Sequence, residues 1–173
     1  MKKLQKLKLA NKCSLQELTI GMQPLGAIDL AAMIGGLNEQ LSISGGVLKN
    51  VEGGVLFTGS DGSTCLFEHV SWSTDYVLPG KAYQLNGTIH ISESWLNDEE
   101  YPFTVKRFAH EFGHYLQQQE YGTSSYLWNV AVRSVYSVAT DPANHYSEPF
   151  EQDATNRGED YLKDHLKKPN PKK

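Results

Sequence analysis

The spacing of hydrophobic residues divides the chain into two parts. Between residues 37 and 92, apolar positions alternate with polar ones or form short runs separated by Gly, Ser and Pro, which is typical of strands and turns. From about residue 101 onward, apolar residues recur every three or four positions, which is the period of an amphipathic helix. Strands followed by helices predict an α+β fold.

Residues 37–60 predict short strands and turns, with a linker as the alternative. Further strands are predicted at residues 64–70, 75–78 and 87–92, and helices at residues 101–121, 124–139 and 147–166. Pro102 and Pro149 are expected in first turns of helices, where proline is tolerated. The basic residues 167–173 are predicted to be a frayed tail.

The composition is that of an ordinary globular protein. Of 173 residues, 39% are hydrophobic and 21% charged, and no run of about 18 apolar residues predicts a membrane span. The net charge of −4 argues against nucleic acid as the main partner. The two cysteines, Cys13 and Cys65, fit no zinc-ribbon or thioredoxin spacing, so no chemistry is predicted for them.

Charge is distributed unevenly along the chain. Residues 1–36 hold five lysines and two acidic residues, a net charge of +3, whereas residues 37–173 hold 11 basic and 18 acidic residues, a net charge of −7. The lysines are not followed by the continuous apolar run of a secretory signal. The basic segment and the acidic body are therefore expected to have different roles.

The end of the basic segment resembles the double-glycine leader of exported bacterial peptides. Such leaders end in Gly-Gly and carry apolar residues at fixed positions before the cut, often with one acidic residue. The matching residues here are Leu25, Asp29, Leu30, Met33, Gly35 and Gly36. The resemblance implies that an export transporter with a papain-like peptidase domain cuts after Gly36. The alternative is an amphipathic N-terminal helix that packs on the domain.

The most specific chemical pattern is His110-Glu111-Phe112-Gly113-His114, within the first predicted helix. Histidines four residues apart lie on one helix face, so their rings are able to bind one ion. Glu111 lies beside them and is able to take a proton from a metal-activated water. Gly113 allows another element to approach the helix closely.

This motif resembles the active-site helix of zincin metallopeptidases. The branch with a third histidine is excluded, because Gln117 and Glu120 occupy its characteristic positions. In the branch with a glutamate ligand, that glutamate precedes a small alanine by three residues on a later helix. Glu151 and Ala154 match this pattern, and Glu148 is the alternative ligand.

The same resemblance implies further features of the site. An aspartate often follows the alanine and braces a metal-bound histidine, but this chain has Thr155 there, which leaves the bracing of the histidine open. The strand at residues 87–92 is expected to border the cleft and to pair with an extended substrate. A donor to the developing oxyanion is expected from His145 or Tyr146, with Tyr121 and Tyr126 as further candidates.

The resulting hypothesis is a small zinc peptidase, secreted after removal of a leader. Its expected parts are a leader at residues 1–36, a zincin-like domain at residues 37–166 and the tail at residues 167–173. Its expected partners are a peptide or protein substrate and the export transporter. The alternatives are an exported bacteriocin-like or interaction protein with a structural metal site, and a cytoplasmic peptidase with an N-terminal regulatory arm.

Overall fold

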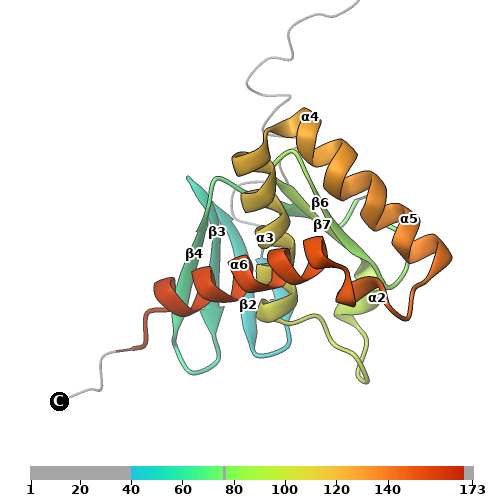
Figure 1. Ribbon diagram of the computed structural model, residues 1–173. Coiled ribbons are helices and arrows are strands. Elements are labelled where there is room, and N and C mark those ends of the chain that lie inside the picture. The colour runs from blue at the N-terminus through green and yellow to red at the C-terminus, as the bar shows by residue number, and fades with distance from the viewer. Residues whose placement is uncertain (1–39, 76, 170–173) are drawn as a thin grey trace, which may run out of the picture.

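A computed structural model describes residues 40–75 and 77–169. The segment predicted to be a leader lies outside these residues, so its role stays a prediction. Within them, the architecture is α+β, as the sequence predicts: two small sheets come first and the helices follow (Figure 1). No helix in this part of the chain has the length and apolar character needed to span a membrane.

The first sheet is an antiparallel meander, and the second places its central strand between a parallel and an antiparallel neighbour. The meander contains β1 (Gln40–Ile43), β2 (Gly46–Val51), β3 (Gly54–Gly59) and β4 (Thr64–Glu68). The second sheet has the order β5 (Ser71–Ser73), β7 (Thr88–Ile91) and β6 (Ala82–Leu85). In the part of the chain described, β6 is therefore an edge strand.

Two long helices cross in front of the sheets, and a helical arm lies to one side of them (Figure 1). The crossing helices are α3 (Val105–Tyr121) and α6 (Pro149–His165), and the short α2 (Glu93–Leu96) precedes them. The helical arm consists of α4 (Thr123–Tyr126), the π-helical turn η1 (Leu127–Ala131) and α5 (Val132–Thr140). The 3-10 turn η2 (His145–Ser147) connects this arm to α6.

Aromatic side chains join the meander to the crossing helices. Phe67 of β4 contacts Phe108 and Phe112 of α3 edge to face, with ring centroids 4.9 and 5.1 Å apart. Tyr161 of α6 stacks on Phe67 and donates a hydrogen bond to the Leu66 carbonyl. These contacts fix both helices against one sheet. The thiol of Cys65 lies in the same core, where burial raises its pKa to about 11.

The two helices approach each other through glycine. A Cβ atom added to Gly113 would overlap the carbonyl of Ala154, and one added to Gly158 would overlap the carbonyl of Ala109. The close approach expected at Gly113 and Ala154 is therefore present. The contact between Gly158 and Ala109 is of the same kind and lies about one helical turn away. Because the proposed ligands lie on both helices, this crossing sets the distance between them.

We predict that Gly158→Ala destabilises the protein, because the added methyl group forces α3 and α6 apart. Overpacking of this kind costs about 1–3 kcal/mol in the free energy of unfolding, and more where backbone has to move. Urea unfolding monitored by circular dichroism measures the loss. The control is Asn156→Ala on the exposed side of α6, for which a change of less than about 0.5 kcal/mol is expected. Equal stability of the two variants would contradict this view of the crossing.

The structure corrects two of the strand predictions. Residues 40–59 form three paired strands, so the linker alternative is wrong for them. The strand predicted at residues 75–78 is absent at Asp75, Val77 and Leu78, and β5 and β6 lie on either side of this segment instead. The turn predicted at Pro79-Gly80 is present.

The helix boundaries follow local hydrogen bonds. The first predicted helix begins at Val105 and not near Tyr101, because the Thr104 side chain caps it by accepting a hydrogen bond from the Arg107 amide. Pro149 occupies the first turn of α6, as predicted. Lys167, predicted to lie in a frayed tail, instead exchanges two backbone hydrogen bonds with Thr64.

Candidate metal centre

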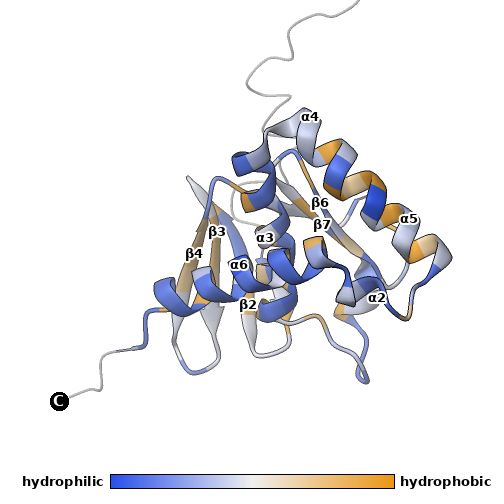
Figure 2. Cartoon of the chain, in the orientation of Figure 1, coloured by the Kyte–Doolittle hydropathy of each residue, from blue (hydrophilic) through white to orange (hydrophobic). Residues whose placement is uncertain are grey.

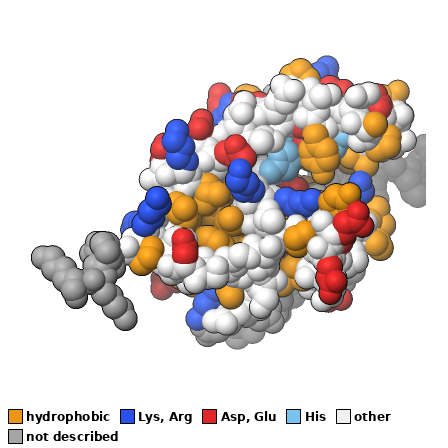
Figure 3. All heavy atoms as spheres, turned by 90° about the horizontal axis from the view of Figure 1, so that it is seen from below, with side chains coloured by type: hydrophobic (Ala, Val, Ile, Leu, Met, Phe, Trp, Pro, Cys, Tyr) orange, Lys and Arg blue, Asp and Glu red, His pale blue; other side chains and the backbone are white. Residues whose placement is uncertain are grey.

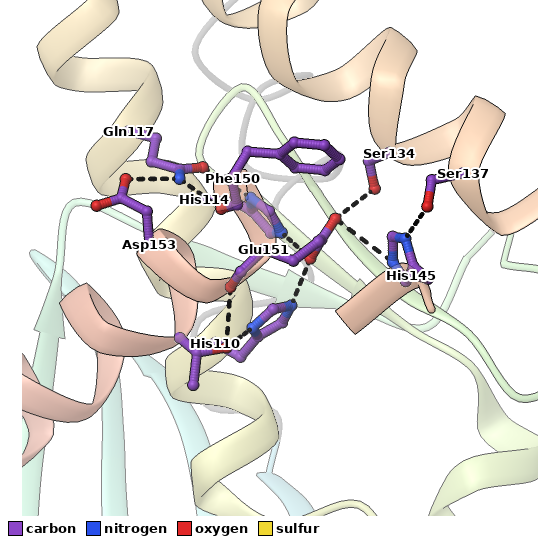
Figure 4. A network of polar contacts seen from close by, with 10 residues as sticks. His110, His114, Gln117, Ser134, Ser137, His145, Phe150, Glu151 and Asp153 are labelled. Atoms are coloured by element: carbon purple, nitrogen blue, oxygen red, sulfur yellow. Dashed lines mark hydrogen bonds and ion pairs between the residues drawn. The ribbon is translucent and has the colours of Figure 1, made fainter. Parts of the chain in front are cut away.

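Three of the predicted ligands meet where α3 and α6 cross. His110 and His114 lie one turn apart on α3, and Glu151 projects toward both from α6 (Figure 4). Its Oε2 atom lies 3.2 Å from His110 Nε2 and 3.1 Å from His114 Nε2. The Glu151 side chain is only 1% exposed. These residues are the group within the described chain that could hold a metal ion.

Thr155 fixes the proton position on His110. The Thr155 hydroxyl donates a hydrogen bond to the Glu151 carbonyl at 2.9 Å, so its oxygen is available to accept. His110 Nδ1 lies 2.9 Å from that oxygen and therefore donates its proton to it. Thr155, at the position where the resemblance predicts an aspartate, thus orients the His110 ring through a neutral hydroxyl.

Gln117 performs the same function for His114. Its Nε2 group donates to the Phe150 carbonyl and to Asp153 Oδ2, both at 2.8 Å. This orients the amide so that Gln117 Oε1 accepts from His114 Nδ1 at 2.9 Å. Asp153 is in turn held by an ion pair with Arg157. The bracing of His114 therefore extends from α3 across to α6.

Because His110 and His114 both donate from Nδ1, each ring, when neutral, carries its lone pair on Nε2. That lone pair points toward Glu151. Two such lone pairs and a carboxylate oxygen are all acceptors, so their convergence is favourable only around a cation or a shared proton. Tetrahedral zinc with bonds of about 2.0–2.1 Å separates its ligand atoms by about 3.3 Å. The two nitrogen–oxygen distances are close to this value, and the three ligand atoms lie within 4.8 Å of one another, so the residues could hold such an ion.

The second oxygen of Glu151 is held from the helical arm. Ser134 of α5 donates to Oε1 at 2.7 Å, and His145 Nε2 lies 3.4 Å from the same atom (Figure 4). Ser137, also on α5, lies 3.2 Å from His145 Nδ1. Burial alone would raise the pKa of Glu151. Donation from the two α3 histidines, when a proton is shared at their Nε2 atoms, and from Ser134 outweighs burial and holds this pKa well below its usual range. The carboxylate is thus kept ionised and oriented.

Glu111 lines a cleft at this centre. The cleft has a volume of about 530 Å³ and also includes His110, His114 and Glu151 in its lining. Histidine side chains are visible beside hydrophobic ones where the surface is hollowed (Figure 3). Burial raises the pKa of the Glu111 carboxyl, although the neighbouring histidines oppose the rise.

The strand that borders the cleft is β6 and not the predicted one. The segment at residues 87–92 forms β7, which is central because β5 pairs on one side of it and β6 on the other. Ser92 N donates to the Lys81 carbonyl, so Lys81 and Ser92 form a hydrogen-bonded pair. Because hydrogen-bonded and non-hydrogen-bonded pairs alternate along antiparallel strands, the backbone N–H and C=O groups of Ala82 and Gln84 point away from β7. Lys81, Ala82 and Tyr83 line the cleft. The edge strand β6 therefore borders the cleft through Ala82 and Tyr83.

Other predicted candidates take different places. Glu148, the alternative ligand, precedes α6 and does not belong to the convergent group. Tyr146 lines the cleft, with its ring 6.1 Å from that of His110. Tyr126 is buried beside His114, whereas Tyr121 is exposed near Asp153. The contacts of Gln117 and Ser134 were not predicted, because neither residue belongs to the motif.

Comparisons with known proteins leave this geometry as the main guide to function: no family model matches the chain, and neither the curated proteins nor the solved structures include a match. The fold is α+β, and the partly buried His110, the buried His114 and the distant, buried Glu151 are consistent with a zincin-like site.

Proposed function

We propose that this chain is a zinc-dependent peptidase. The observation that carries the proposal is the position of Glu111 in the wall of the cleft, next to three converging acceptor atoms on α3 and α6. A structural zinc site is normally closed by four protein ligands, whereas a catalytic one has three and keeps a position for water or substrate. Two histidines and one glutamate make three protein ligands, which is the number typical of a catalytic zinc site.

The reaction follows from the residues around the cleft. When bound, zinc supplies the polarisation of a water molecule and of the scissile carbonyl. Glu111 accepts a proton from the attacking water and passes it to the leaving amine. Thr155 and Gln117 keep the Nε2 atoms of both histidines directed at the centre. The proposed chemistry is thus hydrolysis of a peptide bond without a covalent intermediate on the protein.

Two neighbouring residues are proposed to support this reaction in different ways. His145, expected from the sequence as an oxyanion donor, lies against Glu151 Oε1 and contacts Ser137. This contact suits it to positioning the carboxylate. Tyr146 lines the open cleft with a mostly exposed side chain, so its hydroxyl is the better placed donor to a developing oxyanion.

Metal removal and restoration test this proposal. Elemental analysis of the purified full chain is expected to find one zinc per molecule. Dialysis against a chelator is expected to abolish cleavage of casein and of a mixed peptide library, and added zinc to restore it. Bound zinc without cleavage of any substrate would contradict the enzyme and favour a metal that only holds the helices together. Stoichiometric iron instead of zinc would contradict the proposed chemistry.

We further propose that the peptidase is secreted after its leader is removed. The support is the sequence alone, since Gly35-Gly36 and the apolar residues before it match a double-glycine leader. The partner in this step is an export transporter that carries a leader peptidase. Mass spectrometry of the exported protein is predicted to find Leu37 at its N-terminus. A different N-terminus, or a chain that stays intact inside the cell, would contradict the leader.

A further inference from the structure

The helix that forms one wall of the cleft exposes its apolar side. Most helices on a protein surface bury apolar residues and expose polar ones. On α5, the polar residues Ser134 and Ser137 point into the protein, where they contact Glu151 and His145. Val135 is 71% exposed and Val132 is 52% exposed. The hydrophobic colouring of this helix is visible in Figure 2.

Part of this apolar surface faces the centre. Val135, Val138 and Ala139 line the cleft from α5, and Leu78, which is 75% exposed, lines it before β6. Val132 does not belong to the lining. Large apolar side chains left open to solvent around a hollow are typical of a ligand-binding groove. The side chain that the groove accepts is therefore expected to be apolar.

The edge of β6 indicates what kind of molecule carries that side chain. The backbone groups of Ala82 and Gln84 point away from β7, and Ala82 lines the cleft. Such an edge binds an extended polypeptide through backbone hydrogen bonds. A peptide aligned there would lie between β6 and α5, so its side chains would reach Val135 and Val138.

We propose that the cleft selects a polypeptide with an aliphatic residue, such as leucine, next to the bond that is cut. Val135 and Val138 of α5, together with Leu78, form the specificity surface for this residue. The inference rests on the proposed function and names its substrate class. An aspartate at the same substrate position would lose its hydration against these side chains without gaining a partner, so it is disfavoured.

Three hydroxamates test the specificity without requiring turnover. Acetohydroxamate binds a catalytic metal but has no side chain to fill the groove, whereas N-acetyl-leucine hydroxamate and N-acetyl-aspartate hydroxamate differ only in that side chain. Calorimetry on the zinc-loaded full chain is expected to give a Kd for the leucine compound that is at least about tenfold lower than for the aspartate compound. Val135→Asp is expected to remove this preference and leave the Kd of acetohydroxamate unchanged.

The control variant is Val132→Asp, which lies on the same helix but outside the lining of the cleft. Because both valines are exposed, neither change is expected to unfold the protein. Equal binding of the leucine and aspartate compounds, with acetohydroxamate still bound, would overturn the specificity but not the peptidase. An equal loss in both valine variants would also overturn it. Absence of zinc and of acetohydroxamate binding would instead refute the proposed function, and the specificity with it.

Discussion

Glu111→Gln is expected to abolish peptide cleavage and to leave zinc bound. Glutamine has nearly the same shape as glutamate, so the packing beside His110 and His114 is retained. Its neutral amide, however, is not able to take a proton from water. Loss of a positioned general base reduces rates by about 10²–10⁴-fold. The expected kcat/KM is therefore at least about a hundredfold below that of the wild type.

The measurement combines cleavage of a fluorogenic peptide with elemental analysis of the same sample. Glu120→Gln is the matched control, because it makes the same chemical change on the same helix at an exposed residue. The control is expected to keep nearly full activity, since exposed ion pairs contribute little to stability. A Glu111→Gln protein with more than about a tenth of the wild-type rate would exclude Glu111 as the base.

Glu151→Gln is expected to weaken zinc binding by more than about a hundredfold. The change removes the negative charge of the carboxylate, whose Oε2 atom lies near the Nε2 atoms of both histidines. Loss of a residue that merely orients a ligand already costs about 10–100-fold in metal affinity, so loss of a charged ligand costs more. Competition with a chromophoric chelator measures the affinity of the purified variant.

Glu148→Gln provides the matched comparison for this ligand. Both glutamates lie at the start of α6, and the sequence alone left the choice between them open. Because Glu148 is outside the convergent group, its variant is expected to bind zinc within a few-fold of the wild type. The reverse result, with tight binding by Glu151→Gln and weak binding by Glu148→Gln, would exchange the two assignments.

The sequence predicts the centre of the site well because the information there is local. Histidines four residues apart on a helix share a face whatever the rest of the fold does. Gly113 and Ala154 mark the close contact between the two helices, and the structure places them against each other. Glu151 is implied by the resemblance to glutamate-type zincins, in which the ligand precedes an alanine by three residues, and Glu148 stays an alternative at that stage. The two histidines are therefore predicted from local spacing, whereas the third ligand is assigned only by the assembled fold.

The outer contacts are less predictable because they depend on how distant segments meet. Gln117 acts on His114 only because Phe150 and Asp153 of α6 hold its amide. Ser134 reaches Glu151 only because the helical arm folds back over the crossing of α3 and α6. No motif or periodicity marks such positions. Their roles become visible only in the assembled fold.

One missed element did have a local signal. Asn86 and Gly87 both have positive φ and connect β6 to β7 in a two-residue turn. Asn-Gly between two strands is the preferred sequence for this type of hairpin. This signal predicts β6 and makes the strand at residues 87–92 the second strand of a hairpin. Whether β7 or β6 is the edge still depends on β5, which pairs with β7 from another part of the chain.

Zinc K-edge X-ray absorption of the zinc-loaded full chain tests the central claim most directly. The residues that converge between α3 and α6 offer two imidazole nitrogens and carboxylate oxygen, and no sulfur. The account predicts four to five nitrogen and oxygen neighbours at about 2.0–2.1 Å, with the outer-shell scattering of two imidazoles. That imidazole scattering is expected to disappear in a His110→Ala, His114→Ala double variant. A sulfur neighbour near 2.3 Å, or a spectrum unchanged in the double variant, would contradict the account.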